Sequence, residues 1–352
     1  MVINTTKTYY KKRFWAGILL VQFLLFYTFS NFKFFIDFFE NFYDFQKNFH
    51  IAVFSWIPFS FGDLLYILAS LFLLKTVCTA FQKKLRKNAL LQLLIFLNIS
   101  YFSYQIFWGM MYFQTPIIKK LHSQEKPTVE KAKILALKYL NKAKETRKYV
   151  TEDHNGVFII KDRNTLINQI LAQQKSFPKY ISSKTPLVKK SVKESIFSNV
   201  MNFTGISGYY NPFTAESQFN YNLPHSILPF TIAHETSHQL GFAREQEASF
   251  MAYLTGTQSK NLDLKYSTEY ATLKSLLRYI SGEDEAFALQ IIKQYSPAMK
   301  RDRAYERNFM IKHQSQLEDF FSFTNDLFLK SNRQDGAITY SYFIDLLLNH
   351  EK

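Results

Sequence analysis

Residues 231–253 read TIAHETSHQLGFAREQEASFMAY and contain a His-Glu-x-x-His motif. His234 and His238 are four residues apart, so on a helix both imidazoles lie on one face and can bind a single cation. Glu235 is one position further round, where its carboxylate can reach a water molecule on that cation. Zinc lowers the pKa of such a water molecule toward neutrality. The glutamate accepts a proton from this water as the water attacks a carbonyl group. The motif predicts hydrolysis that depends on one Zn²⁺ ion.

A catalytic zinc site of this kind takes three protein ligands and leaves a further position for water. Gly241 can adopt the left-handed conformation that ends a helix, so the chain can turn back toward the two histidines. Glu245 and Glu247 follow within reach of such a turn. The spacing alone leaves both carboxylates as candidates for the third ligand.

The motif also has a simpler interpretation, a surface helix with two solvated histidines. Ile232, Ala233 and Leu240 flank the motif and indicate a buried helix instead. Burying two histidines and a glutamate is costly unless they bind something. His225 stands alone in a predicted loop before the motif, and we expect it to be structural or exposed.

The composition narrows the class of protein that carries this motif. The chain has 352 residues, a formal net charge of +15 and one cysteine, Cys78, which excludes an intrachain disulfide and a cysteine-based metal site. Apolar residues are concentrated in the first third of the chain. Membrane anchoring explains much of the basic excess there more simply than nucleic acid does. We therefore expect a lipid bilayer, and no nucleic acid, among the partners.

Three stretches are long and apolar enough to be membrane-spanning helices: residues 14–30, 64–81 and 89–113. The first and third carry no charge, and the second carries only Lys75, near enough to one end to reach the headgroups. Buried helices of a soluble core are the alternative. Three such runs within about 100 residues are hard to accommodate in a soluble domain of this size. We predict a membrane region over residues 1–114.

Basic residues predict the orientation of these spans. Clusters of Lys and Arg in residues 7–13 and 82–88 precede the first span and join the second to the third. By the positive-inside rule both face the cytoplasm, which leaves residues 115–352 outside as one domain. No small-residue cleavage site follows the first span, so we expect it to be a retained anchor. Residues 31–63 also fall outside, and their many phenylalanines indicate either helices lying on the bilayer or a packing surface for the outer domain.

The outer domain reads as α+β and helix-dominated. Helices are expected over residues 126–149 and 164–175, through most of the chain from the motif to residue 325, and over residues 340–350. Strands are expected at residues 156–161 and, as an edge strand, at 216–222. The predicted architecture is three membrane helices followed by this domain.

The segment HETSHQLGF resembles the start of the astacin-type metzincin motif, in which a third histidine follows six residues after the second. Arg244 occupies that position here. A guanidinium that stays protonated cannot bind zinc, so the metzincin assignment fails.

The fuller pattern resembles domain-of-unknown-function family 3810, bacterial membrane proteins placed among zincin-like metallopeptidases. The resemblance rests on the three spans and on the segments GYYNPFTAESQFN, PFTIAHETSHQLGFAREQEASF and NDLFLKSN, and it covers most of the chain. It implies a zincin-like (gluzincin-type) peptidase domain on the outer side of the bacterial cytoplasmic membrane. It supplies no substrate.

Zincins with a glutamate ligand are similar to one another in placing a small polar or acidic residue four positions after that ligand, where it can hydrogen-bond a ligand histidine. Ser249 stands four residues after Glu245, whereas a methionine stands four after Glu247. The resemblance therefore favours Glu245 as the third ligand, with Glu247 as the alternative. Glu247 is then left to pair with Arg244 or to orient the site.

The resemblance also implies residues that contact a substrate. Zincins use an edge strand beside the motif helix to bind an extended peptide, and Tyr209, Tyr210 and Asn211 lie in the matching segment. They commonly hold the developing oxyanion with a tyrosine or histidine. Tyr210 and Tyr340 are the candidates, with plain packing as the alternative for each.

We expect a membrane-anchored zinc peptidase that hydrolyses proteins or peptides outside the cytoplasmic membrane. The alternatives are a non-catalytic membrane scaffold or sensor with the same fold, and zinc-dependent hydrolysis of a non-peptide bond. An intact Glu235 beside both histidines favours catalysis, because a scaffold does not need it. The sequence names neither a substrate nor an oligomeric state.

Overall fold

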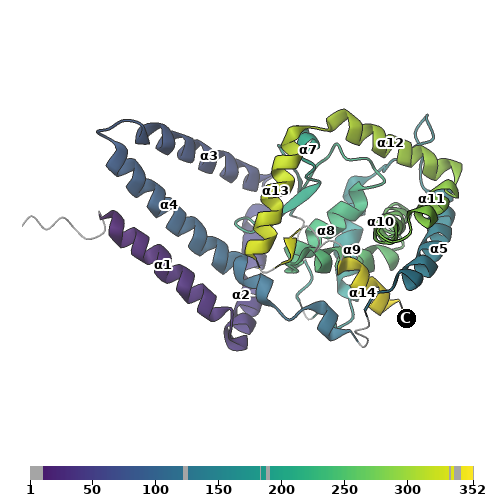
Figure 1. Ribbon diagram of the computed structural model, residues 1–352, viewed down its shortest axis with the longest axis horizontal. Helices are drawn as coiled ribbons and strands as arrows, with labels where there is room; N and C mark the ends of the chain where they lie inside the picture. The colour runs from purple at the N-terminus through teal and green to yellow at the C-terminus, as the bar shows by residue number, and fades with distance from the viewer. Residues whose placement is uncertain are drawn as a thin grey trace, which may run out of the picture.

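The computed structural model describes residues 11–121, 126–182, 184–187, 191–332, 334–336 and 342–351. Within these residues the fold is helix-dominated, as the sequence predicts, with one small sheet. Figure 1 shows long apolar helices extending to one side of a compact helical body.

The extended helices are α1 (Lys12–Phe29), α3 (Phe61–Ala80) and α4 (Arg86–Phe107), and each is long and apolar enough to cross a membrane. Helix α4 packs against both of the others. Their starts lie within three residues of the predicted spans. The third predicted span was too long at its end, because Trp108 leaves the helix and residues Gly109–Phe113 form the 3₁₀ turn η2. Trp108 and most of η2 are buried, so packing against the body overrides the apolar run there.

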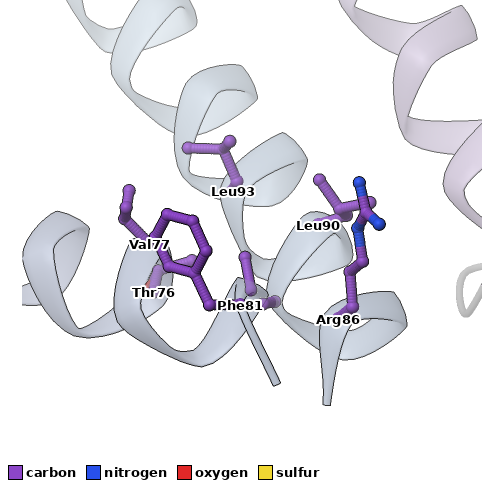
Figure 2. Close-up of a pocket in the computed structure, with 8 residues that line it drawn as sticks. Thr76, Val77, Phe81, Arg86, Leu90 and Leu93 are labelled. Carbon is purple, nitrogen blue, oxygen red and sulfur yellow. The ribbon is translucent and has the colours of Figure 1, made fainter. Parts of the chain in front are cut away.

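The far end of the α3–α4 hairpin carries a shallow pocket lined by residues of both helices, among them Val77, Phe81, Arg86 and Leu90 (Figure 2). The connection between the two helices lies at the end of the hairpin away from the body (Figure 1). This pocket is therefore remote from the His-Glu-x-x-His motif.

Helix α2 (Lys33–Phe54) lies where the extended helices meet the body (Figure 1) and has two distinct faces. One face is buried and includes Phe39, Tyr43, Gln46, Lys47 and Ile51. The other exposes Phe34, Phe38, Phe45 and Phe49. Packing against the body thus accounts for one face and leaves the phenylalanine face uncovered.

The sheet contains β1 (Val192–Glu194), β2 (Gly208–Asn211) and β3 (Glu216–Phe219) in the order β1-β3-β2. Strand β3 runs parallel to β1 and antiparallel to β2. The strand predicted at residues 216–222 is present as β3, but its predicted edge position is wrong, because β3 is central, ends at residue 219 and is buried along its whole length.

The polar residues of β3 are the reason for that error. Polar and apolar residues alternate over 218–222 and suggest one solvated face, yet the polar side chains of β3 have buried partners. Ser217 Oγ donates to the Glu235 carbonyl oxygen at 2.9 Å, and Glu216 accepts from Gly62 N at 2.6 Å. The strand predicted at residues 156–161 is also wrong, since Phe158 forms only an isolated bridge with Glu152.

The body is built from helices around a long central one. Helix α10 packs against α5, α9 and α8, and its inward residues, such as Leu273 and Leu276, are fully buried. The helices are α5 (Val129–Thr146), α6 (Arg163–Gln173), α7 (Ser198–Thr204), α8 (Leu228–Leu240), α9 (Glu245–Thr257), α10 (Leu262–Ser281), α11 (Glu285–Lys293), α12 (Pro297–His313), α13 (Gln316–Ser331) and α14 (Phe343–His350), with short 3₁₀ turns η3 (Ile117–Lys120), η4 (Arg147–Tyr149) and η5 (Gln174–Ser176).

Candidate metal centre

Helix α8 carries the motif and ends in a sharp turn. Gly241 has a φ of 115°, and its N–H bonds back to the carbonyl oxygens of Ser237 and His238. A Cβ at Gly241 would lie 2.8 Å from the ring of Tyr43, so close approach adds to the conformational requirement for glycine. Helix α9 then begins at Glu245, which returns the chain toward the two histidines.

The turn brings three potential ligand atoms together. Glu245 Oε2 lies 3.1 Å from His234 Nε2 and 3.6 Å from His238 Nε2, and the two Nε2 atoms are 3.1 Å apart. Ligand atoms at about 2.1 Å from a tetrahedral zinc ion are roughly 3.4 Å from one another. The three side chains therefore fit one zinc ion in both donor type and spacing.

Both histidine rings are held from the side opposite this cluster. The Nδ1 atom of His238 lies 2.7 Å from the Phe242 carbonyl oxygen, which can only accept, so this nitrogen carries the proton and Nε2 of the neutral ring is free to bind a metal. Ser249 Oγ lies 3.1 Å from His234 Nδ1. Such partners orient metal-binding imidazoles and fix their tautomer.

Within the cluster, His238 is buried and His234 and Glu245 are half-buried, and their charges interact strongly. Burial works against a charge on His238, but the Glu245 carboxylate outweighs it and raises the pKa of His238 to about 9. Burial likewise works against the Glu245 carboxylate, and the two histidines outweigh it and lower the pKa of Glu245 well below its ordinary range. A negative carboxylate beside two imidazoles favours a positive charge between them. A metal cation can supply that charge, and its binding releases the protons that the ligands would otherwise hold.

Glu235 lies between helix α8 and strand β2. Burial raises the pKa of its carboxyl group to about 7, against the lowering effect of the two histidines. A Cβ on Gly208, the first residue of β2, would lie 2.8 Å from Glu235 Oε1. The absence of a side chain at Gly208 thus makes the space that Glu235 occupies.

Glu247 points elsewhere. Its Oε1 accepts from Ile117 N at 2.8 Å and from Arg244 Nη1 at 3.0 Å. Arg244 Nη2 in turn donates to the carbonyl oxygens of Tyr112 and Gln114 at 2.8 and 2.7 Å. The Arg244–Glu247 pair fastens the chain that follows η2 to the start of α9, and only Glu245 of the two glutamates faces the histidines.

The predicted substrate-contacting residues lie on both faces of β2. The hydroxyl of Tyr210 is 2.9 Å from that of Tyr43, and its ring packs against Trp108. Tyr209 and Asn211 face the other way, where Tyr209 bonds to Asp63 near the start of α3 and Asn211 is fully buried. The two tyrosine hydroxyls are hydrogen-bonded within the protein and Asn211 is buried, so the main chain of β2 is what remains for an extended peptide. Tyr340 lies outside the described residues.

The structure adds residues that the sequence did not point to. The ring of Trp108 meets that of His238 edge-on, with centroids 6.0 Å apart. Tyr43 is hydrogen-bonded to the Gln239 carbonyl oxygen at 2.9 Å, and Gln334 Oε1 accepts from Glu245 N at 3.3 Å. Sequence reasoning missed Trp108 and Tyr43 because they lie in apolar, phenylalanine-rich runs that indicate a membrane. Their only local signal of a role at the site is the hydrogen-bonding group on each ring, the indole N–H and the phenol hydroxyl.

Comparison with known proteins gives a family and no closer relative. The model of a family described as "Protein of unknown function (DUF3810)" matches residues 38–348, from helix α2 to helix α14. No curated protein matches the chain, and no solved structure does.

Proposed function

We propose that this chain, which belongs to the DUF3810 family, is a zinc-dependent peptidase anchored in the bacterial cytoplasmic membrane by α1, α3 and α4, with its body outside. The observation that carries the proposal is the cluster of His234, His238 and Glu245, whose ligand atoms all lie within 4.8 Å of one another. The buried carboxyl group of Glu235 beside them supplies the base that hydrolysis requires.

The donor set supports zinc over other common cations. Two imidazole nitrogens and one carboxylate oxygen are the ligands of many catalytic zinc sites, whereas calcium and magnesium prefer oxygen alone. A zinc ion held here would polarise the carbonyl group of a peptide bond and make a water molecule acidic. Ser249 and the Phe242 carbonyl oxygen would keep the histidines in orientation.

Glu235 would accept the proton of the attacking water and pass it to the leaving amine. A base works best when its pKa lies near the working pH, and burial brings that of Glu235 to about 7. Strand β2 runs beside helix α8, and β3 is its only partner strand in the part of the chain that the structure describes. Its outer edge suits main-chain pairing with an extended peptide, which would lie across the metal cluster.

The test replaces the base alone. Glu235→Gln should keep zinc, because the three ligands remain, and should abolish hydrolysis, because the amide accepts no proton. Proteins outside the cytoplasmic membrane are compared between cells that carry the native chain and cells that carry this variant, with the exposed Glu283→Gln as the matched control. Proteins that accumulate, and fragments that disappear, only in Glu235→Gln are the expected substrates and products. Identical protein profiles would favour the non-catalytic scaffold.

A further inference from the structure

The candidate metal centre lies close to the end of an apolar helix. Helix α4 has 22 residues and is therefore about 33 Å long, close to the roughly 30 Å thickness of a bilayer's hydrocarbon core. Trp108 follows it directly, and its ring centroid lies 6.0 Å from that of His238. If α4 crosses a membrane, its end and the metal ligand lie together at the membrane surface.

Helix α2 supports the same position. Its buried face holds α8, since Tyr43 bonds to the Gln239 carbonyl oxygen and Lys47 Nζ donates to the Leu240 carbonyl oxygen at 3.1 Å. Its opposite face exposes four phenylalanines at spacings of four, seven and four residues: Phe34, Phe38, Phe45 and Phe49. A helix that binds a folded domain on one side and exposes a phenylalanine row on the other is suited to the bilayer surface.

Helix α13 provides a second apolar face beside the metal centre. Its exposed residues Leu317, Phe320, Phe323 and Leu327 share one side, while Glu318, Asp319 and Asp326 lie on the other. The helix lies on the side of the body that faces α3 and α4 (Figure 1).

The residues at the end of α13 contact both the C-terminal end of α4 and the metal centre. Tyr104 of α4 donates to Asn332 Oδ1 at 3.0 Å, and its ring packs against Phe328. Gln334, two residues further on, accepts from the backbone N–H of Glu245. Helices α2 and α13, which carry these uncovered faces, are thus both linked to the centre. Tyr43 of α2 packs against Trp108 at the end of α4, and the end of α13 contacts α4 through Tyr104.

We propose that the substrate is the extended juxtamembrane segment of another membrane-anchored polypeptide, cut at the membrane surface while the apolar faces of α2 and α13 rest in lipid. This inference rests on the proposed peptidase function. A polypeptide chain that leaves the bilayer passes this level as it emerges, in an extended form that can pair with the edge of strand β2. Anchoring both molecules in one membrane also raises their effective concentration.

The first experiment measures depth and needs no activity. The full chain with Cys78→Ser receives one nitroxide label, at Phe323→Cys on α13 or at Leu289→Cys on α11, which lies at the far end of the body (Figure 1). Both native side chains are exposed and apolar. In proteoliposomes the label at residue 323 should collide with dissolved oxygen more than with a water-soluble nickel chelate, and the label at residue 289 should do the reverse. Preference for the chelate at both positions overturns the proposal.

The second experiment measures hydrolysis by the full chain in zinc-containing proteoliposomes. The probe is a quenched fluorescent library of random peptides, presented free, acyl-anchored through a two-residue spacer, or acyl-anchored through a flexible spacer of about thirty residues. The short-spacer form should be cleaved at least about tenfold faster than the free form at equal total concentration. Equal rates for free and anchored peptides, or cleavage of the long-spacer form alone, overturn the proposal. Rates no higher than those of Glu235→Gln for every form reject the peptidase function, and the substrate class with it, whatever the depth result.

Discussion

Glu245 and Glu247 are two residues apart at the start of α9, so their side chains leave the helix about 200° apart and only one can face the histidines. In the structure, Glu245 contacts His234. Glu247 instead accepts hydrogen bonds from Arg244 and from the backbone N–H of Ile117. Removal of each carboxylate is therefore expected to change a different measurable property, zinc content for Glu245 and stability for Glu247.

Glu245→Ala should sharply lower the zinc content of the purified full chain, because it removes one of three ligands. Glu247→Ala should keep zinc but lower the melting temperature, because it leaves the buried N–H of Ile117 without its acceptor, at a cost of about 1–3 kcal/mol. Metal analysis and thermal unfolding of both variants check the pair. Loss of zinc in Glu247→Ala alone would make Glu247 the ligand.

Ser249 offers a finer test of the same cluster. Ser249→Ala removes the hydroxyl that lies 3.1 Å from His234 Nδ1 and should weaken zinc binding about 10- to 100-fold without unfolding the chain. Competition with a chelator of known affinity measures the change. The exposed Ser281→Ala, which is remote from the motif in sequence, is the control. Equal affinities in both variants would remove Ser249 from the site.

At the scale of elements, strand β2 and helix α8 meet so closely that no side chain fits between Gly208 and Glu235. Two hydrogen bonds fix α8 to strand β3, the partner of β2: Ser217 Oγ donates to the Glu235 carbonyl oxygen, and Gln239 Nε2 donates to the Ala215 carbonyl oxygen at 2.7 Å. The sheet therefore sets the distance between the edge strand and the base. A small change in that distance is expected to affect hydrolysis more than folding.

Gly208→Ala places a methyl group 2.8 Å from Glu235 Oε1, so either the carboxylate or the strand must move. We expect hydrolysis of the peptide library to fall at least about tenfold, the scale on which misplaced catalytic groups lower rates. Zinc content should stay unchanged, because no ligand is touched. Gly282→Ala is a matched control, since the nearest atom to its Cβ would be 3.5 Å away. Native rates in Gly208→Ala would show that Glu235 does not need this position.

At the scale of the whole molecule, the α3–α4 hairpin separates its connecting loop from the body by the full length of two apolar helices (Figure 1). If these helices cross a membrane, the basic loop and the body must face opposite sides. The body carries the candidate metal centre, so the side of the membrane on which the body lies decides which proteins can reach that centre.

A reporter enzyme that is active only outside the cytoplasm tests this orientation. Fused after Lys352 it should be active, and fused at Asn88 it should be inactive, because the positive-inside rule keeps the loop with Lys83 and Lys87 in the cytoplasm. Reporter assays in intact cells give the result. Activity only in the Asn88 fusion would reverse the topology and place the candidate peptidase in the cytoplasm.

The sequence alone determined those features that depend on near neighbours in the chain. The apolar helices follow from composition, and the shared face of His234 and His238 follows from helical spacing. The turn at Gly241 follows from the conformational freedom of glycine. The resemblance to glutamate zincins pointed to Ser249 as a partner of a ligand histidine, because it stands four residues after Glu245 on one short helix. The family was likewise identified from segments that are continuous in sequence.

Tertiary structure alone decided what depends on distant segments. The alternation over residues 218–222 could not reveal that β3 is a central strand, because the polar residues of β3 have partners such as Gly62, more than one hundred residues away. Nor could an aromatic run reveal that Trp108 meets His238 or that Tyr43 holds α8. A local pattern states which groups need partners, whereas the packing of remote elements decides which partners they receive. The position of the candidate metal centre beside the end of α4 is a property of that packing.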